Sequence, residues 1–174
     1  MLYSELQCSE AIRKAVERMG FAEMTEIQEK TIPVMLAGHD VIAKAPTGTG
    51  KTCAFGIPVA EHIQPENKYP QAVIMAPTRE LAQQIAEELS NLTYFMPEVQ
   101  VACVYGGANM EKQAKRLAEG CQIVVATPGR LMDHYKHHSI DLAHVTQVVL
   151  DEADEMLNMG SVSYTHLTLP TKRI

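Results

Sequence analysis

Residues 45–52, APTGTGKT, constrain the fold of this chain more than any other stretch. They fit the phosphate-loop pattern GxxxxGK[ST], except that Ala45 replaces the opening glycine. The short apolar run at residues 41–43 suits a buried parallel strand, and the residues after Thr52 are typical of a helix. Strand, loop and helix form the context that the pattern requires. The sequence therefore predicts a nucleoside triphosphate site on an α/β sheet.

Each part of this loop has a physical role. Gly48 and Gly50 let the backbone curl so that successive amide groups face the phosphates, and the following helix adds the positive end of its dipole. Lys51 can reach the terminal phosphates, and the Thr52 hydroxyl can take one coordination position of a Mg²⁺ ion. A plain glycine-rich turn needs neither side chain. The predicted nucleotide-binding residues are Ala45, Pro46, Thr47, Gly48, Thr49, Gly50, Lys51 and Thr52.

Length and charge limit the other possibilities. The 174 residues suffice for one ordinary domain, and a formal charge of −6 argues against a strongly basic nucleic-acid binder, so any nucleic-acid contact must be local. The four cysteines form no CxxC pair, which indicates a reducing cytoplasm, with neither a disulfide framework nor a structural metal. No apolar run suits a membrane span.

Short apolar runs alternate with helical patterns along the chain. Such alternation predicts right-handed crossovers and a parallel sheet with helices on both faces, with ligands at the carboxyl ends of the strands. The predicted strands are residues 41–43, 72–75, 99–104, 123–126 and 148–150. The predicted helices begin at Ser9, at Thr25 and after the glycine-rich loop, and also cover residues 77–89, 110–118 and 131–135.

Two acids follow the last predicted strand. Asp151 can hold Mg²⁺, through water, and Glu152 is placed to orient and deprotonate the water that attacks the terminal phosphate. The alternative is a pair of solvated acids at the start of a helix. A phosphate loop in the same chain favours the catalytic reading, in which Lys51, Asp151 and Glu152 are the catalytic residues.

At residues 151–154 the sequence reads DEAD, and the chain resembles the first core domain of a DEAD-box RNA helicase. GFAEMTEIQ, APTGTGKT, PTRELA, the Gly106–Gly107 pair, TPGR and DEAD follow one another in the order of that family. The resemblance covers about residues 1–160. It implies a RecA-like P-loop domain that binds ATP and Mg²⁺.

The resemblance also implies how adenine is recognised. The Gln28 amide can pair with the adenine edge, and Tyr3 offers a face on which the base can stack, with Phe21 and Thr25 in the same motif. Thr25 and Gln28 also have the spacing of a capping box, and one amide cannot fully serve both roles. Met24 stands where the family usually has proline, so the entry turn is expected to be less rigid.

A second implied site holds RNA by its phosphate backbone, without sequence preference. Its residues lie just beyond predicted strand ends, where backbone amides and helix N-termini can bind phosphate. They are Pro77, Thr78, Arg79, Gly107, Thr127, Pro128, Gly129 and Arg130.

Three histidines have a spacing that could place two imidazoles on one helix face for a metal. They are His134, His137 and His138. No cysteine or acid completes a ligand set, so a solvated polar face is the favoured interpretation.

The resemblance ends after Gly160. Residues 162–174 look like the translation of a sequencing-library adapter, so we expect residues 1–160 to be a truncated ATP-binding domain and residues 161–174 a non-natural, disordered tail. The sheet would then be incomplete at the C-terminus, and the second RecA-like domain would be missing.

Together these features predict the ATP-binding half of an ATP-dependent RNA helicase, which couples ATP binding and hydrolysis to local RNA unwinding or remodelling. The parent would be an ATP hydrolase, whereas the fragment alone would be nearly inactive. The alternative is a non-enzymatic module that binds nucleotide or RNA or docks on a partner.

Overall fold

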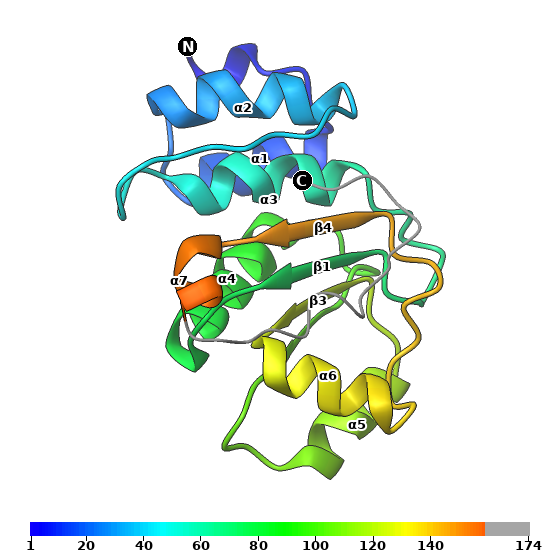
Figure 1. Cartoon of the computed structure of the whole chain (residues 1–174). Coiled ribbons are helices and arrows are strands. Elements are labelled where there is room, and N and C mark those ends of the chain that lie inside the picture. The colour runs from blue at the N-terminus through cyan, green and yellow to red at the C-terminus, as the bar shows by residue number, and fades with distance from the viewer. Residues whose placement is uncertain (159–174) are drawn as a thin grey trace.

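The structure, a computed structural model, describes residues 1–158. At its centre lies a parallel four-stranded sheet in the order β2-β3-β1-β4. Helices cover both faces of this sheet (Figure 1), which confirms the predicted α/β architecture. The strands are β1 (Ala72–Met75), β2 (Val101–Val104), β3 (Ile123–Ala126) and β4 (Gln147–Leu150).

Side chains of each inner strand alternate between two apolar clusters. On β1, Ala72 and Ile74 join the larger cluster, whereas Val73 and Met75 join the smaller one on the other face. Because both faces are covered, all four residues of β1 are buried. This is why the strand reads as an unbroken apolar run rather than as an alternating pattern.

The larger cluster lies under four helices and a short 3-10 turn. Ser9 begins the first helix, where its hydroxyl accepts a hydrogen bond from the Ile12 amide. Gly56 allows a close helix crossing, because a Cβ atom there would lie 2.8 Å from Leu92 Cδ1. These elements are η1 (Tyr3–Glu5), α1 (Glu10–Arg18), α2 (Glu26–Leu36), α3 (Lys51–Glu61) and α4 (Arg79–Leu92).

On the opposite side, α5 (Met110–Ala118) and α6 (Pro128–Lys136) cover the sheet, and α7 (Ala153–Asn158) follows β4 (Figure 1). Helix α6 begins at Pro128, before the predicted residues 131–135. Proline fits this first helical position, because its fixed φ is helical and its missing N–H would have no partner there.

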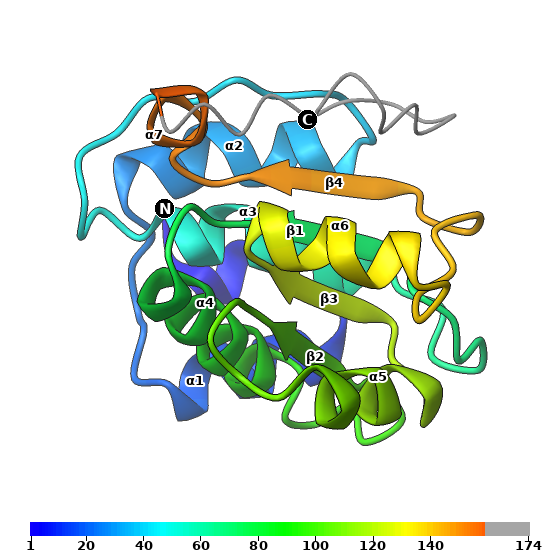
Figure 2. The same cartoon turned by 60° about the horizontal axis from the view of Figure 1, so that its bottom comes forward.

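The predicted strand at residues 41–43 is wrong in this structure. Residues 39–46 have no regular secondary structure and run as a coil past α2 and α3, with Ile42 fully exposed (Figures 1 and 2). Only Val41 of this run packs against the larger apolar cluster. Within residues 1–158 no strand lies beyond β4, so a strand here would keep one edge of unpaired amide and carbonyl groups.

Residues 159–174 lie outside the described residues, and so do the expectations for Gly160 and for the tail. Within residues 1–158, no helix combines the length and the apolar character that a membrane span needs.

Candidate nucleotide site and adjoining phosphate-binding surface

The motif residues gather at the carboxyl edge of the sheet. PTRELA follows β1, the Gly106–Gly107 pair follows β2, TPGR follows β3 and Asp151 follows β4. All strands run in parallel, so these four strand ends face the same way (Figure 2). The predicted position at a strand end is therefore confirmed for these four motifs, whereas the glycine-rich loop follows a coil.

The glycine-rich loop has the backbone that phosphate binding requires. Gly48 (φ +81°) and Gly50 (φ +80°) are left-handed, a conformation that glycine adopts without strain. The Thr49 hydroxyl donates to the Pro46 carbonyl at 2.7 Å and closes the loop on itself. Helix α3 begins at Lys51 without a side-chain cap. Its first amide groups are therefore suited to an anion.

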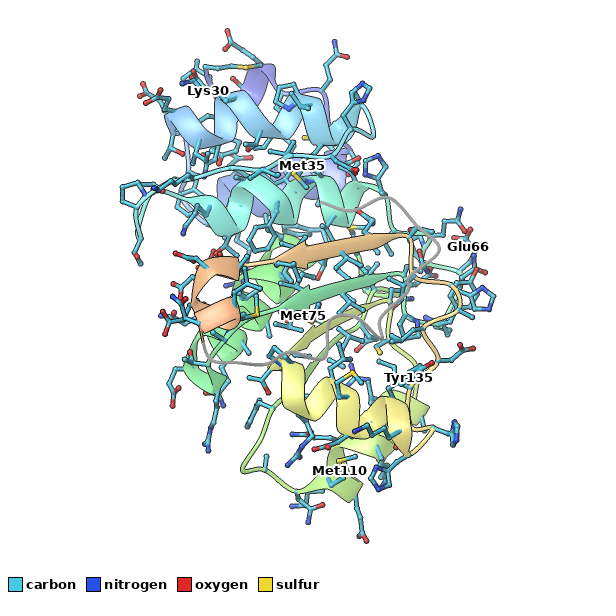
Figure 3. The ribbon with its side chains drawn as sticks, in the orientation of Figure 1. Lys30, Met35, Glu66, Met75, Met110 and Tyr135 are labelled. Carbon is cyan, nitrogen blue, oxygen red and sulfur yellow. The ribbon has the colours of Figure 1, made fainter. Side chains whose placement is uncertain are left out.

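Lys51 and Asp151 line one cavity of about 100 Å³ between α2, α3 and the end of β4. Burial raises the pKa of Asp151, and the Lys51 ammonium opposes that rise. The rest of the lining is largely apolar, and the side chain of Met35 on α2 points toward α3 (Figure 3). The lysine and the acid at the end of β4 are thus close in space, as the two motifs require. The other lining residues include Val41, Phe55 and Leu150.

Glu152 has a backbone conformation that residues other than glycine rarely adopt. Its φ is +52°, whereas Asp151 continues the sheet by donating its amide to the Met75 carbonyl at 2.9 Å. The chain therefore turns sharply directly after the strand. Non-glycine residues in this region carry strain and often lie at functional sites.

Glu88 on α4 is a site residue that the sequence did not reveal. It is half-buried, and burial raises the pKa of its carboxyl group, whereas hydrogen bonding by the Thr52 side chain lowers this pKa and the charge of Asp151 raises it further. Three oxygen-bearing side chains of this region thus influence one another: Thr52, Glu88 and Asp151. Their oxygen atoms are ligands that Mg²⁺ prefers.

The Gln28 amide binds both its own helix start and the glycine-rich loop. Its Oε1 accepts hydrogen bonds from the Tyr3 hydroxyl and from the Thr25 amide at 3.0 Å, and its Nε2 donates to the Gly50 carbonyl at 3.0 Å. The Thr25 hydroxyl donates to the Thr49 carbonyl at 2.8 Å. The capping box is therefore formed, and the same two residues fasten α2 to the loop.

Two aromatic rings accompany Gln28, and they differ in exposure. Tyr3 is buried, with 5% of its surface exposed, and burial raises the pKa of its hydroxyl. Its ring stacks on Phe21 with centroids 6.4 Å apart, and Phe21 is 44% exposed. Phe21 therefore offers the more accessible aromatic face. Met24, which stands where the family usually has proline, donates its amide to the Met1 carbonyl at 2.9 Å, which proline could not do.

Arg79 and the glycine pair after β2 form a second, exposed group. The Arg79 guanidinium lies over the Tyr105 ring, 5.1 Å from its centroid, and Gln83 donates to the Tyr105 hydroxyl at 3.0 Å. A Cβ atom on Gly107 would lie 3.7 Å from Arg79 Nη1. Thr78 caps α4 by accepting from the Leu81 amide at 3.2 Å. PTRELA and the glycine pair thus meet on one surface.

Arg130 of TPGR faces the protein rather than solvent. Only 13% of its side chain is exposed, and its Nη1 donates to the Ala108 carbonyl at 2.9 Å and to Gln113 Oε1 at 3.1 Å. Asp133 lies 3.7 Å from its Nε. The predicted motif arginine is therefore present at this surface but is occupied by partners within the domain.

The predicted solvated histidine face is wrong for His134. This residue is fully buried, and its Nε2 lies 3.1 Å from Gln113 Oε1, whereas His137 and His138 are exposed. Leu131 and His134, three residues apart, form the buried stripe of α6, so packing of the helix determines their burial.

Comparisons with known proteins agree with this arrangement. The family model for DEAD/DEAH box helicases matches residues 25–171. The chain belongs to the DEAD/DEAH box helicase family. It is 53% identical over 160 residues to the ATP-dependent RNA helicase CshA of Limosilactobacillus reuteri, and 44% identical to the ATP-dependent RNA helicase DeaD of Escherichia coli. Both alignments cover 92% of this chain.

Solved structures of helicase-family proteins have the same fold. The crystal structure of a DEAD box protein from Methanococcus jannaschii matches 95% of this chain with a TM-score of 0.86 and 40% identity. This confirms the RecA-like fold. The chain spans only 32% of the CshA relative, 25% of the DeaD relative and 45% of the crystallised protein.

Proposed function

We propose that residues 1–160 are the ATP-binding domain of an ATP-dependent RNA helicase. The whole protein would couple ATP binding and hydrolysis to local unwinding or remodelling of RNA. One observation carries this proposal: the glycine-rich loop, the acids after β4 and the exposed group around Arg79 lie along one edge of the sheet. The retained Lys51, Asp151 and Glu152 count against a purely non-enzymatic module.

The phosphates of ATP would lie on the amides of the glycine-rich loop and at the start of α3, next to the Lys51 ammonium. Thr52 and Asp151 offer oxygen ligands for Mg²⁺, Asp151 through water, and that ion would neutralise phosphate charge when bound. Glu152, turned away from the strand direction by its positive φ, would orient and deprotonate the attacking water. Glu88 would hold the Thr52 hydroxyl in place.

Adenine recognition would use Gln28 and an aromatic face. Gln28 Oε1 and Nε2 already have partners in the domain, so pairing with the base would exchange the Gly50 carbonyl or the Tyr3 hydroxyl for the adenine edge. Stacking would fall to Phe21, because Tyr3 is buried beneath it. Base recognition and the shape of the phosphate loop would then be coupled.

RNA phosphates would lie on the surface formed by PTRELA, Gly107 and the first residues of α6. The contributing residues would be Pro77, Thr78, Arg79, Gly107, Thr127, Pro128 and Gly129, mostly through backbone amides and helix N-termini. Such contacts read the backbone, so we expect no sequence preference and a weak dependence on salt.

The remaining catalytic groups would come from a second RecA-like domain in the whole protein, and residues 161–174 would be a non-natural tail.

We place the whole protein in the cytoplasm, because all four cysteines of this chain lie within residues 1–158 and are free thiols.

Calorimetric titration of the chain with Mg-ADP and Mg-GDP tests the nucleotide site. We expect ADP to bind at least about tenfold more tightly, a difference of ~1.4 kcal/mol. Lys51→Ala should weaken both nucleotides, whereas Gln28→Ala should remove mainly the preference for adenine. Equal binding of ADP and GDP by the unmodified chain would show that Gln28 does not read the base.

A further inference from the structure

Gln113 connects the loop after β2 with α6, and both elements contribute to the proposed RNA-binding surface. It lies on α5 and is 9% exposed, although four of the nine residues of this helix are charged. Its Nε2 donates to the Tyr105 carbonyl at 3.0 Å, directly before the glycine pair. Its Oε1 accepts from Arg130 Nη1 and lies 3.1 Å from His134 Nε2. One amide therefore connects the loop after β2 with the start and the middle of α6.

The two arginines of this surface differ in how they are held. Arg130 points inward and donates to Ala108 and Gln113, and the Ala108 carbonyl belongs to the loop that carries the glycine pair. Arg79 is exposed, stacks on Tyr105, and forms no ion pair within residues 1–158. The geometry therefore leaves Arg79 available for a phosphate and engages Arg130 in holding the loop.

His134 supports the same reading. Glutamine Oε1 can only accept, so His134 Nε2 must carry the proton of this bond. Its Nδ1 is buried and has no hydrogen-bond partner within residues 1–158. An apolar side chain at position 134 would avoid this unsatisfied atom. We therefore infer that His134 serves to hold the Gln113 amide through the bond from its Nε2.

We propose that Gln113 is a positioning residue of the RNA surface, and that Arg130 acts through the glycine-pair loop rather than by touching a phosphate. This inference rests on the proposed RNA binding. Without the Gln113 amide, the Tyr105 carbonyl and the Arg130 guanidinium each lose a partner. The loop amides would then no longer be held in one arrangement for the backbone. The nucleotide site lies at the other end of the sheet edge, beside β4, and would not be affected.

The salt dependence of RNA affinity separates a contact from a positioning role. Each phosphate contact on a single strand contributes ~0.7 to the slope of log affinity against log salt concentration. Fluorescence anisotropy with a labelled single-stranded oligoribonucleotide gives both affinity and slope for this chain. Arg79→Gln should lower both. Gln113→Met and Arg130→Gln should lower affinity by about tenfold and leave the slope unchanged, as expected when a donor arrangement is lost rather than a charge contact.

Arg116→Gln is the matched charge control. Arg116 also lies on α5 but binds the Gly120 carbonyl and Gln100, so its loss changes the net charge without touching the loop after β2. Calorimetry with ADP should give the same affinity for Gln113→Met as for the unmodified chain. Gln113→Glu keeps the acceptor for Arg130, so it should recover part of the RNA affinity that Gln113→Met loses.

Several results would overturn the proposal. If Arg130→Gln lowers the salt slope as much as Arg79→Gln does, Arg130 touches a phosphate. If Gln113→Met binds RNA normally, or loses ADP and RNA affinity together, Gln113 has no specific positioning role. Failure of the unmodified chain to bind RNA would instead overturn the proposed function, and this inference with it.

Discussion

Replacing Gln28 should destabilise the folded chain as well as change its nucleotide preference. Gln28 is 4% exposed and fixes Tyr3, Thr25 and Gly50 with its single amide. In Gln28→Ala the Thr25 amide can turn to water, because Thr25 is exposed, but the Tyr3 hydroxyl is left in a buried site. A buried group without a partner costs ~1–3 kcal/mol and each lost hydrogen bond about 1 kcal/mol. We therefore expect a total loss of roughly 2–4 kcal/mol.

A double-mutant cycle isolates the buried pair. Tyr3→Phe removes the hydroxyl and should cost about 1 kcal/mol in the unmodified chain. In Gln28→Ala the same change removes a group that has already lost its partner, so it should cost little or even stabilise. The coupling energy between the two sites should thus be ~1–2 kcal/mol. Tyr135→Phe is the control, because Tyr135 is exposed on α6 (Figure 3) and should be additive with Gln28→Ala.

Urea unfolding followed by circular dichroism provides the free energies, with both single variants and the double variant measured at one pH. Additivity of Tyr3→Phe and Gln28→Ala within about 0.3 kcal/mol would refute the reasoning, because independent sites behave in that way. It would mean that the Tyr3 hydroxyl does not depend on Gln28 in solution.

Three further predictions concern pH, packing and turnover. Burial, together with the charge of Arg130, lowers the pKa of His134. Below pH 6.5, the ordinary pKa of histidine, the unfolded chain therefore takes up a proton that the folded chain does not, so the free energy of unfolding should fall as the pH drops. His134→Phe should flatten this dependence in urea melts at several pH values, and His137→Phe, at an exposed site, should not. Gly56→Leu should push α3 away from Leu92 and lower the free energy of unfolding by ~1–3 kcal/mol in thermal or urea melts, although leucine has the better helix propensity. Unchanged stability would contradict the close helix crossing. Phosphate-release assays should find turnover of Mg-ATP near background with or without RNA, because an arginine from a second domain can contribute ~1,000- to 100,000-fold to the rate; strong RNA-stimulated turnover by this chain would contradict that.

Local patterns in the sequence determined most of the secondary structure. The predicted strands at residues 72–75 and 123–126 coincide with β1 and β3, and the helix at residues 110–118 coincides with α5. Burial on both faces requires apolar runs, and caps such as Ser9 and Thr78 mark helix starts through bonds to nearby amides. The position of the motifs at one edge of the sheet follows from the same alternation, because right-handed crossovers leave little other choice.

The tertiary structure alone decided which groups those motifs meet. A strand at residues 41–43 needs neighbours that no local pattern supplies, and it does not form. The pairing of Glu88 with Thr52 and of Gln113 with Arg130 depends on how helices distant in sequence pack against each other. The burial of His134 depends on the face that α6 turns toward the sheet. A short sequence window specifies the direction of its own backbone, whereas the partner of a polar side chain is set by contacts between windows, which only the packed domain brings together.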